Sequence, residues 1–533
     1  MDSFDYVIVG AGAAGCVLAN RLTERGTTTV CVLEAGGKDS HPFIKVPAGF
    51  VKTVYSDKFA WPFKTEPSDS IGGRQIAIPQ GRVIGGSSSI NGMVYNRGQR
   101  LDFDTWAQFG NRGWSYDDLL PYFKRSENRI GPGDDTYRGR DGELPVTDND
   151  WINPLCEAFL DAAAGQGIPR NSDYNGALQF GAGYYQRLIH GGKRVSAADA
   201  FLRPALKRAG TSLRMHAQVL AITFDGKRAT GVRYRDPDGT EHTVQASKEV
   251  IVSSGTVNSA KLLQLSGLGP STLLNDLGVP IVAALDGVGE NLRDHFSARI
   301  VARARDVTTI NQYGKWPRLG IEMVKWLAGK PNVLSLSPSV AYVHAKSHPD
   351  LDDADMRILF TPGSYKDGRI YVLDDYPGMT CGAAQPRPES TGYVRARSRN
   401  PMESPAVQPN YLQAEADQRI TVAGIRLVRK MFHSTEMARY FVQETLPGPQ
   451  ATSDDELLDF ARQRGNTGYH LVGTCRMGPA TNRWAVVDDQ LRVHGIEGLR
   501  VADASIMPTL PSANTYASTL AIAEKAADLI RSA

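Results

Sequence analysis

The stretch YVIVGAGAAG, residues 6–15, decides the fold of the first part of this chain. A short β-rich run leads into glycines spaced G-x-G-x-x-G, a helical pattern follows to Leu22, and TVCVLE at residues 29–34 is typical of a second strand. The first glycine permits a tight turn, the second lets a pyrophosphate approach the backbone, and the third lets helix and strand pack closely. The pattern predicts a βαβ unit whose helix start binds a dinucleotide.

An acidic residue ends the second predicted strand. Glu34 follows Gly15 by 19 residues, where a carboxylate accepts hydrogen bonds from both hydroxyls of a ribose. An acid at this place disfavours the extra phosphate of NADP. The motif by itself leaves NAD and FAD as alternatives.

Length and composition limit the classes of protein that remain. A chain of 533 residues is longer than a domain with a single hydrophobic core usually is, so we expect two domains. A net charge of +3 gives no electrostatic footprint for nucleic acid. The five cysteines are scattered without a CxxC pair, so we expect neither disulfides nor a metal site. No apolar run reaches the roughly 20 residues of a membrane helix, and the acidic start is unlike a signal peptide, so we expect a cytoplasmic protein without an integral membrane segment.

Strand and helix patterns of the same kind return late in the chain. A strand and helix are predicted over residues 249–265 after a hairpin at 217–234, and a last strand at 499–503 precedes a helix at 517–530. Alternating segments such as 392–397 predict antiparallel strands in between. We therefore predict an α/β, Rossmann-like nucleotide domain with a discontinuous α+β substrate domain built on an antiparallel sheet. The predicted nucleotide domain takes residues 1–150, 205–300 and 465–533, and the predicted substrate domain takes 151–204 and 301–464.

Three further segments carry a resemblance to a known family. They are GRVIGGSSSINGMVY at 81–95, SGTVNSAKLLQLSGLG at 254–269 and DGVGENLRDH at 286–295. The first offers a run of backbone N–H and hydroxyl donors suited to a pyrophosphate and a flavin edge. Together they resemble the signatures of the glucose-methanol-choline (GMC) oxidoreductases over essentially the whole chain, with Ala260, Asp286 and Arg293 as local departures.

The resemblance implies that the dinucleotide is FAD. Some members attach FAD covalently through a His that precedes the Asn of the first signature, but Ile90 stands there, so we expect noncovalent FAD. Asp503 resembles the acid that hydrogen-bonds the ribityl chain. The cofactor-binding residues that the resemblance implies are Gly10, Gly12, Ala13, Ala14, Gly15, Glu34, Ala35, Arg82, Gly86, Ser87, Asn91, Gly92, Met93, Val94, Val219, Asp503, Ala504, Asn514 and Thr515.

The catalytic pair is placed in the same way. Hydride loss from an alcohol carbon needs a base for the hydroxyl proton, a role suited to histidine. YHLVGTCRMG at 469–478 resembles the family's catalytic-histidine segment, and Ala513-Asn514-Thr515 lies where the family has a second His or an Asn. We expect His470 to be the base and Asn514 to hold the alkoxide, at the start of a helix aimed at the flavin pyrimidine. We expect His295 to be structural, and Tyr469 and residues 385–387 to be pocket walls.

The resemblance implies that the enzyme oxidises a primary alcohol to the aldehyde. The hydride goes to flavin N5, and the electrons pass to oxygen or to a quinone or dye acceptor. Members that act on choline, on aryl or aliphatic alcohols or on 5-hydroxymethylfurfural are the nearest in pattern, although no aromatic cage for choline can be placed in the sequence. The alternative is an FAD-containing lyase of the same fold, like the family's hydroxynitrile lyase, without net redox. The sequence indicates neither the alcohol nor the oligomeric state.

Overall fold

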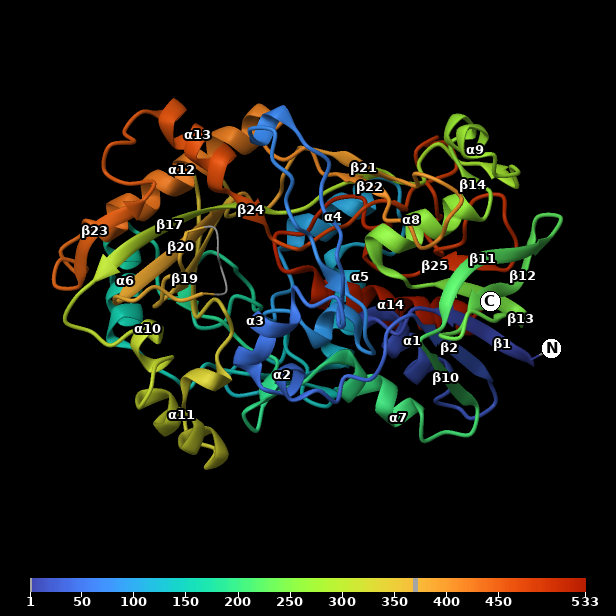
Figure 1. Cartoon of the computed structure of the whole chain (residues 1–533), viewed down its shortest axis with the longest axis horizontal. Helices are drawn as coiled ribbons and strands as arrows, with labels where there is room; N and C mark the ends of the chain where they lie inside the picture. The colour runs from blue at the N-terminus through green and yellow to red at the C-terminus, as the bar shows by residue number, and fades with distance from the viewer. Residues whose placement is uncertain (1, 368–371) are drawn as a thin grey trace.

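The computed structural model describes residues 2–367 and 372–533, with two large sheets toward opposite ends of the molecule's long axis (Figure 1). In the described part of the chain the first sheet has seven strands in the order β10-β2-β1-β13-β12-β11, with β25 paired to β13. Its strands are β1 (Asp2–Val9), β2 (Val30–Glu34), β10 (Thr211–Met215), β11 (Gln218–Asp225), β12 (Arg228–Arg235), β13 (Glu241–Val252) and β25 (Leu499–Val501).

The predicted βαβ unit forms the middle of this sheet. β1 pairs in parallel with β2 and β13, and its Val7 and Ile8 are fully buried. Helix α1 (Ala13–Leu22) follows β1 directly. A Cβ built on Gly15 would lie 1.9 Å from the Gly10 carbonyl oxygen, so only glycine lets this helix pack so close to the strand end. The prediction for the third glycine is therefore confirmed.

The late segments join this sheet as predicted. β13 pairs with the hairpin strand β12 near its start and, in parallel, with β25 near its end. Helix α8 (Gly255–Leu265) follows β13, and α14 (Thr515–Arg531) closes the chain. α14 begins immediately after Asn514, two residues before the expected start, and packs on α1 and on α5 (Tyr116–Ser126).

The second sheet is antiparallel, as predicted. The described residues give it seven strands in the order β23-β17-β20-β19-β18-β7, with β24 paired to β17. One face is covered by α6 (Pro154–Gly165), α12 (Glu415–Phe432) and α13 (Asp454–Arg464) (Figure 1). The strands are β7 (Gly181–Tyr184), β17 (Phe296–Ala304), β18 (Ala341–Ala345), β19 (Met356–Thr361), β20 (Gly378–Ala384), β23 (Phe441–Leu446) and β24 (Asn466–Thr467).

The alternating segment 392–397 is antiparallel but lies elsewhere than expected. β21 (Gly392–Arg395) pairs with β16 (Glu290–Leu292) and β22 (Ala406–Gln408), and it packs near α8 beside the first sheet. Alternation reports one buried face and says nothing about which sheet the strand joins. The expected boundary at residue 300 also falls inside β17, and the domain limits stay a prediction.

The structure also bears on membrane segments, disulfides and metal sites. No helix among them is long and apolar enough to cross a membrane. All five cysteines are buried and free. Within the same residues no group of His, Cys, Asp or Glu side chains is arranged to hold a metal ion.

Candidate active site

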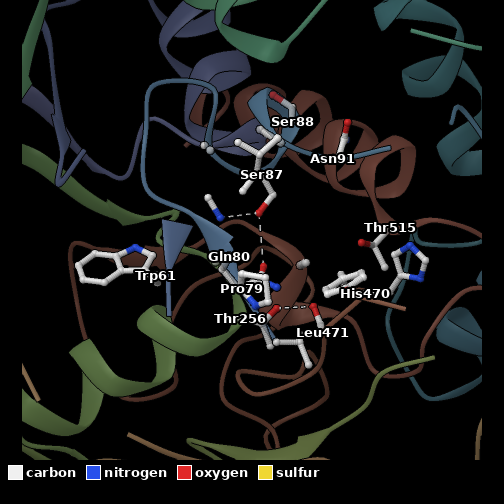
Figure 2. Close-up of a pocket in the computed structure, with 18 of the residues that line it drawn as sticks. Trp61, Pro79, Gln80, Ser87, Ser88, Asn91, Thr256, His470, Leu471 and Thr515 are labelled. Atoms are coloured by element: carbon white, nitrogen blue, oxygen red, sulfur yellow. Dashed lines mark hydrogen bonds between the residues drawn. The ribbon is translucent and has the colours of Figure 1, made fainter. Parts of the chain in front are cut away.

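A cavity of about 460 Å³ is lined by residues from both sheets (Figure 2). The carboxyl ends of β1 and β2, the loop after residue 85 and the start of α8 contribute to one part of its wall. The face of the second sheet opposite its helices contributes to another part, and residues 468–471 and 514–516 line it as well. The cavity therefore joins the dinucleotide loop to the expected catalytic pair.

Nearly all predicted site residues line this cavity. Gly15 and Arg82 are the two that do not. Gly15 acts in helix packing, and the Arg82 guanidinium lies over the Trp61 ring, 4.6 Å from its centroid. The predicted residues that do line the cavity are Gly10, Gly12, Ala13, Ala14, Glu34, Ala35, Gly86, Ser87, Asn91, Gly92, Met93, Val94, Val219, His470, Asp503, Ala504, Asn514 and Thr515.

The two glycine loops form a close-fitting cradle. A Cβ on Gly86 would lie 2.7 Å from the Gly12 Cα, so the loops approach each other at a distance that excludes larger residues. The Ser87 hydroxyl accepts a hydrogen bond from the Gly81 N–H at 3.0 Å and faces Gln80 (Figure 2). Backbone N–H groups beside an open cavity suit a pyrophosphate, so this wall fits the dinucleotide that the motif predicts.

Glu34 lies at the end of β2, as expected for a ribose ligand. Its two carboxylate oxygens accept hydrogen bonds from the Ala11 N–H at 2.9 Å and the Gly36 N–H at 2.8 Å. Burial raises the pKa of Glu34 to about 7, although these two bonds and the charge of Arg82 oppose the rise. Each oxygen keeps a lone pair for a ribose hydroxyl.

Asp503 ties three segments together at the cavity wall. Its carboxylate accepts hydrogen bonds from the Gly255 N–H at 2.9 Å, the Ser259 hydroxyl at 2.6 Å and the Ser505 N–H at 2.8 Å. The side chain therefore caps the turn after β25 and anchors the start of α8. Its expected bond to a ribityl chain stays a prediction.

Sequence reasoning missed Arg194, which supports the first-signature loop. Its guanidinium is buried and donates to the Ile44 and Ser88 carbonyls and to Asn91 Oδ1, the last at 2.8 Å. The same Asn91 oxygen accepts from the Met93 N–H at 3.0 Å. Both bonds fix the orientation of the Asn91 side chain on the cavity wall. Arg194 lies 103 residues from Asn91 along the chain and carries no motif, so no local pattern could have revealed it.

Hydrogen bonds run through the expected catalytic pair in one chain. His295 Nε2 lies 2.7 Å from the Pro386 carbonyl oxygen, and His295 Nδ1 lies 2.9 Å from His470 Nδ1. On the other side of His470, its Nε2 lies 2.9 Å from Asn514 Nδ2. Arg357 Nη2 donates to Asn514 Oδ1 at 2.6 Å.

The ends of this chain determine where its protons lie. A carbonyl only accepts, so His295 Nε2 carries hydrogen and the Nδ1 of a neutral His295 accepts from His470 Nδ1. At the other end Arg357 only donates, so Asn514 presents its oxygen to Arg357 and its NH₂ to His470. His470 Nε2 is therefore the unprotonated nitrogen, and it faces Asn514 at the cavity.

The surroundings keep both histidines neutral. Burial is the main cause that lowers the pKa of His470 well below its usual value, and electrostatic interactions with His295 and Arg357 lower it further. Burial, followed by the charge of Arg357, lowers the pKa of His295 to about 3. At neutral pH His470 can therefore accept a proton, which a base requires.

The backbone of His470 is also held in place. Asp294 Oδ1 accepts from the His470 N–H at 2.6 Å, and its other oxygen accepts from the Tyr411 hydroxyl at 2.5 Å. Burial raises the pKa of Asp294 to about 6. Tyr469, with a φ of 64°, lines the cavity as expected and shares a 2.5 Å hydrogen bond with Tyr55.

One expectation about neighbouring residues needs correction. Residues 385–387 do not line the cavity. The Pro386 carbonyl supports His295 instead, and Arg387 pairs with Asp102 at 2.7 Å. His295 was expected to be structural rather than catalytic; it lines the cavity and contacts the expected base directly, and its role stays a prediction. The His in the third signature was a signal for this position, although nothing in the sequence paired it with His470.

The fold and the site define a dinucleotide-dependent oxidoreductase. The family model of the GMC oxidoreductases matches residues 4–297 with its amino-terminal part and residues 388–523 with its carboxy-terminal part. The chain therefore belongs to the GMC oxidoreductase family. It is an FAD-dependent enzyme that acts on the CH–OH group of alcohols, with a Rossmann-like FAD domain and an antiparallel-sheet substrate domain.

Relatives match over almost the full length. The chain is 39% identical to the oxygen-dependent choline dehydrogenase of Vibrio vulnificus, over 99% of this chain and 94% of the relative. It is 38% identical to an alcohol dehydrogenase [acceptor] of Pseudomonas putida, over 99% and 95%. Among solved structures, pyridoxine 4-oxidase from Mesorbium loti superposes with a TM-score of 0.88 at 29% identity, over 98% of both chains.

Proposed function

We propose that His470 is the general base and Asn514 the alkoxide-binding residue in the oxidation of a primary alcohol to its aldehyde. The observation that carries this proposal is the hydrogen-bond chain that leaves His470 Nε2 as an acceptor next to an Asn514 N–H donor, 2.9 Å away. Bound FAD would supply the hydride acceptor.

The two side chains divide the work on the hydroxyl group. The hydroxyl of the substrate donates to His470 Nε2 and accepts from Asn514 Nδ2 in place of their mutual hydrogen bond. His470 takes the hydroxyl proton as the C–H bond breaks, and Asn514 stabilises the negative charge that develops on oxygen. Arg357 holds the amide of Asn514 in the required orientation through Oδ1. Geometric alignment of this kind also lowers the entropic part of the barrier.

The cofactor is proposed to bind noncovalently. Ile90 lines the cavity and packs in a small apolar cluster with Ile44, Phe59, Ala60 and Val83. Its hydrocarbon side chain has no atom that could form a covalent bond with a flavin. The loop around it would hold the cofactor through backbone N–H groups and serine hydroxyls alone.

Substrate and acceptor are proposed only as classes. Relatives named as choline and alcohol dehydrogenases support an alcohol substrate, and their names include both oxygen and an unspecified acceptor. We propose oxygen or a quinone-type acceptor for the electrons and a cytoplasmic location, which five free cysteines support. The lyase alternative has no support among the relatives.

An anaerobic titration tests the proposal. The purified protein with its bound flavin is mixed with a panel of primary alcohols under nitrogen, and the flavin absorbance at about 450 nm is followed. Bleaching by an alcohol, with the aldehyde as product, is the expected result. Fast recovery in air would identify an oxidase and slow recovery a dehydrogenase. Cleavage of a cyanohydrin without any bleaching would instead establish the lyase.

A further inference from the structure

Two arginines lie on the cavity face of the second sheet. Arg299 is on β17 and Arg357 on β19, and β20 runs between these strands. Gly382 of β20 pairs with both Arg299 and Leu359, whereas Ala384 pairs with Arg357. Both arginines line the cavity. Strand spacing and rise place their Cα atoms roughly 12 Å apart on this face.

Neither guanidinium is neutralised by an acid in the part of the chain that the structure describes. Arg357 is bound by the neutral groups of Asn514 and Tyr185, at 2.6 and 3.2 Å. Arg299 is half-buried, and among the described residues it has no ion pair and no hydrogen-bond acceptor. A partly desolvated cation without a partner is costly, so a ligand that completes the pair is favoured.

The acids of the cavity lie at its other end. Among the described lining residues the only carboxylates are those of Glu34 and Asp503, at the ends of β2 and β25. Both face backbone donors of the nucleotide loops. The substrate end therefore carries two cations and no counter-charge from these residues, which disfavours a quaternary ammonium such as choline.

Polar groups lie beside Arg299 on the cavity wall. Gly382, its direct partner across the strand pair, has no side chain, and the Ser297 hydroxyl oxygen lies 2.8 Å from where a Cβ of residue 382 would be. Tyr365 also lines the cavity, and its pKa, raised by burial, is partly lowered by the charge of Arg299, which places the two groups near each other. A guanidinium with free donors next to a phenol hydroxyl is suited to a carboxylate.

We propose that the enzyme oxidises alcohols that carry a carboxylate several bonds away from the hydroxyl, and that Arg299 binds this carboxylate. The inference rests on the alcohol oxidation proposed above. Arg357 holds Asn514 at the reacting end and Arg299 lies two strands away on the same cavity face, so a carboxylate bound by Arg299 is separated from the hydroxymethyl carbon.

The wild-type protein gives the first test. We compare kcat/KM for 3- and 4-(hydroxymethyl)benzoate and 4-hydroxybutanoate with benzyl alcohol, 4-(hydroxymethyl)benzamide, 1-butanol and choline. We expect at least one carboxylate to exceed its neutral counterpart by about 10- to 100-fold, the range of a charge-assisted hydrogen bond. Choline or a neutral alcohol exceeding every carboxylate would overturn the proposal. Bleaching by neutral alcohols would still support alcohol oxidation, so the two proposals fail separately.

Variants of Arg299 give the second test. In Arg299→Met the ratio of kcat/KM for the preferred carboxylate to that for its neutral counterpart should fall about 10- to 100-fold, and Arg299→Lys should lose less. Arg303→Met is the matched control, because Arg303 lies on the same face of β17, is exposed, and stacks on Tyr376 outside the cavity. Its ratio should stay at the wild-type value.

A binding measurement separates substrate recognition from an effect on the flavin. Benzoate cannot be oxidised, and its binding is followed through the shift it causes in the flavin spectrum. Arg299→Met should raise the Kd of benzoate about 10-fold or more, and Arg303→Met should not. Equal losses in flavin reduction by charged and neutral alcohols, with an unchanged benzoate Kd, would mean that Arg299 acts on the flavin and would overturn the proposal.

Discussion

His295 and His470 share one proton between their Nδ1 atoms, which lie 2.9 Å apart. The Pro386 carbonyl accepts from His295 Nε2 at 2.7 Å, so His295 is the acceptor and His470 the donor in this bond. The tautomer of His470 is thus determined by a backbone carbonyl two hydrogen bonds away. Its Nε2 is left unprotonated, so it can receive the proton of an alcohol once the alcohol replaces its hydrogen bond with Asn514.

Replacement of His295 should leave the tautomer of His470 no longer fixed. In His295→Leu the Nδ1–H of His470 loses its acceptor, and kcat/KM should fall about 10- to 100-fold, as for other residues that orient a functional histidine. His295→Gln keeps an amide oxygen toward His470 and an NH₂ toward Pro386, and it should restore part of the activity. Flavin content, measured by absorbance, should be unchanged in both.

The comparison of these two variants separates orientation from packing. Equal losses in His295→Leu and His295→Gln would argue that the tautomer is not set by this bond. A loss of bound flavin in His295→Leu alone would show that the residue serves the fold instead.

Arg357 should contribute to the pH dependence. The pKa of His470 lies well below its usual value, so His470 is already deprotonated from about pH 6.5 upward. Its titration should therefore cause no change in the kcat/KM of the wild type over that range. The positive charge of Arg357 lowers that pKa, so Arg357→Met should raise it and move the acid limb to higher pH. The check is a kcat/KM profile from pH 5 to 9 by steady-state kinetics. A limb that moves to lower pH in the variant would refute the assigned electrostatic role.

The flavin should leave the protein on denaturation. Ile90 stands where covalent members of the family have a histidine, so acid precipitation should leave the yellow colour in the supernatant. Absorbance of both fractions measures this directly. Colour retained in the washed pellet would contradict noncovalent binding.

His344 should make the enzyme less stable in acid. It is fully buried on β18, neither ring nitrogen has a hydrogen-bond partner among the described residues, and burial lowers its pKa well below the usual value. The unfolded chain takes up a proton below about pH 6.5 that the folded chain does not. The free energy of unfolding of the wild type should therefore fall relative to His344→Leu by about 1.4 kcal/mol per pH unit below pH 6.5.

Urea unfolding at pH 7.5, 6.5 and 5.5 measures this difference. The comparison with His344→Leu cancels the opposite contributions of Asp294 and Glu34, whose pKa values burial raises. A constant difference between the two proteins over this range would show that His344 titrates normally.

Local patterns predicted the parts of this protein that local physics determines. The glycine loop at residues 10–15 and the acid at Glu34 lie within one βαβ unit, where spacing alone specifies the geometry. The predicted pair His470 and Asn514 depended on resemblance, because 44 residues separate two side chains that meet at 2.9 Å.

The remaining features depend on contacts that no short window encodes. Arg194, Arg357 and Pro386 reach the site from three separate segments, and each acts through a bond to a residue far along the chain. The alternation of residues 392–397 predicted a strand correctly but not its sheet, because pairing depends on which edge is free in the folded molecule.

The most direct test of the proposed chemistry is the rate of anaerobic flavin reduction in His470→Ala, measured by stopped-flow absorbance with a substrate alcohol. Removal of a general base should lower this rate by about 100- to 10,000-fold while the variant keeps its flavin. A variant that binds flavin and is reduced within about tenfold of the wild-type rate would contradict the assignment of His470 as the base.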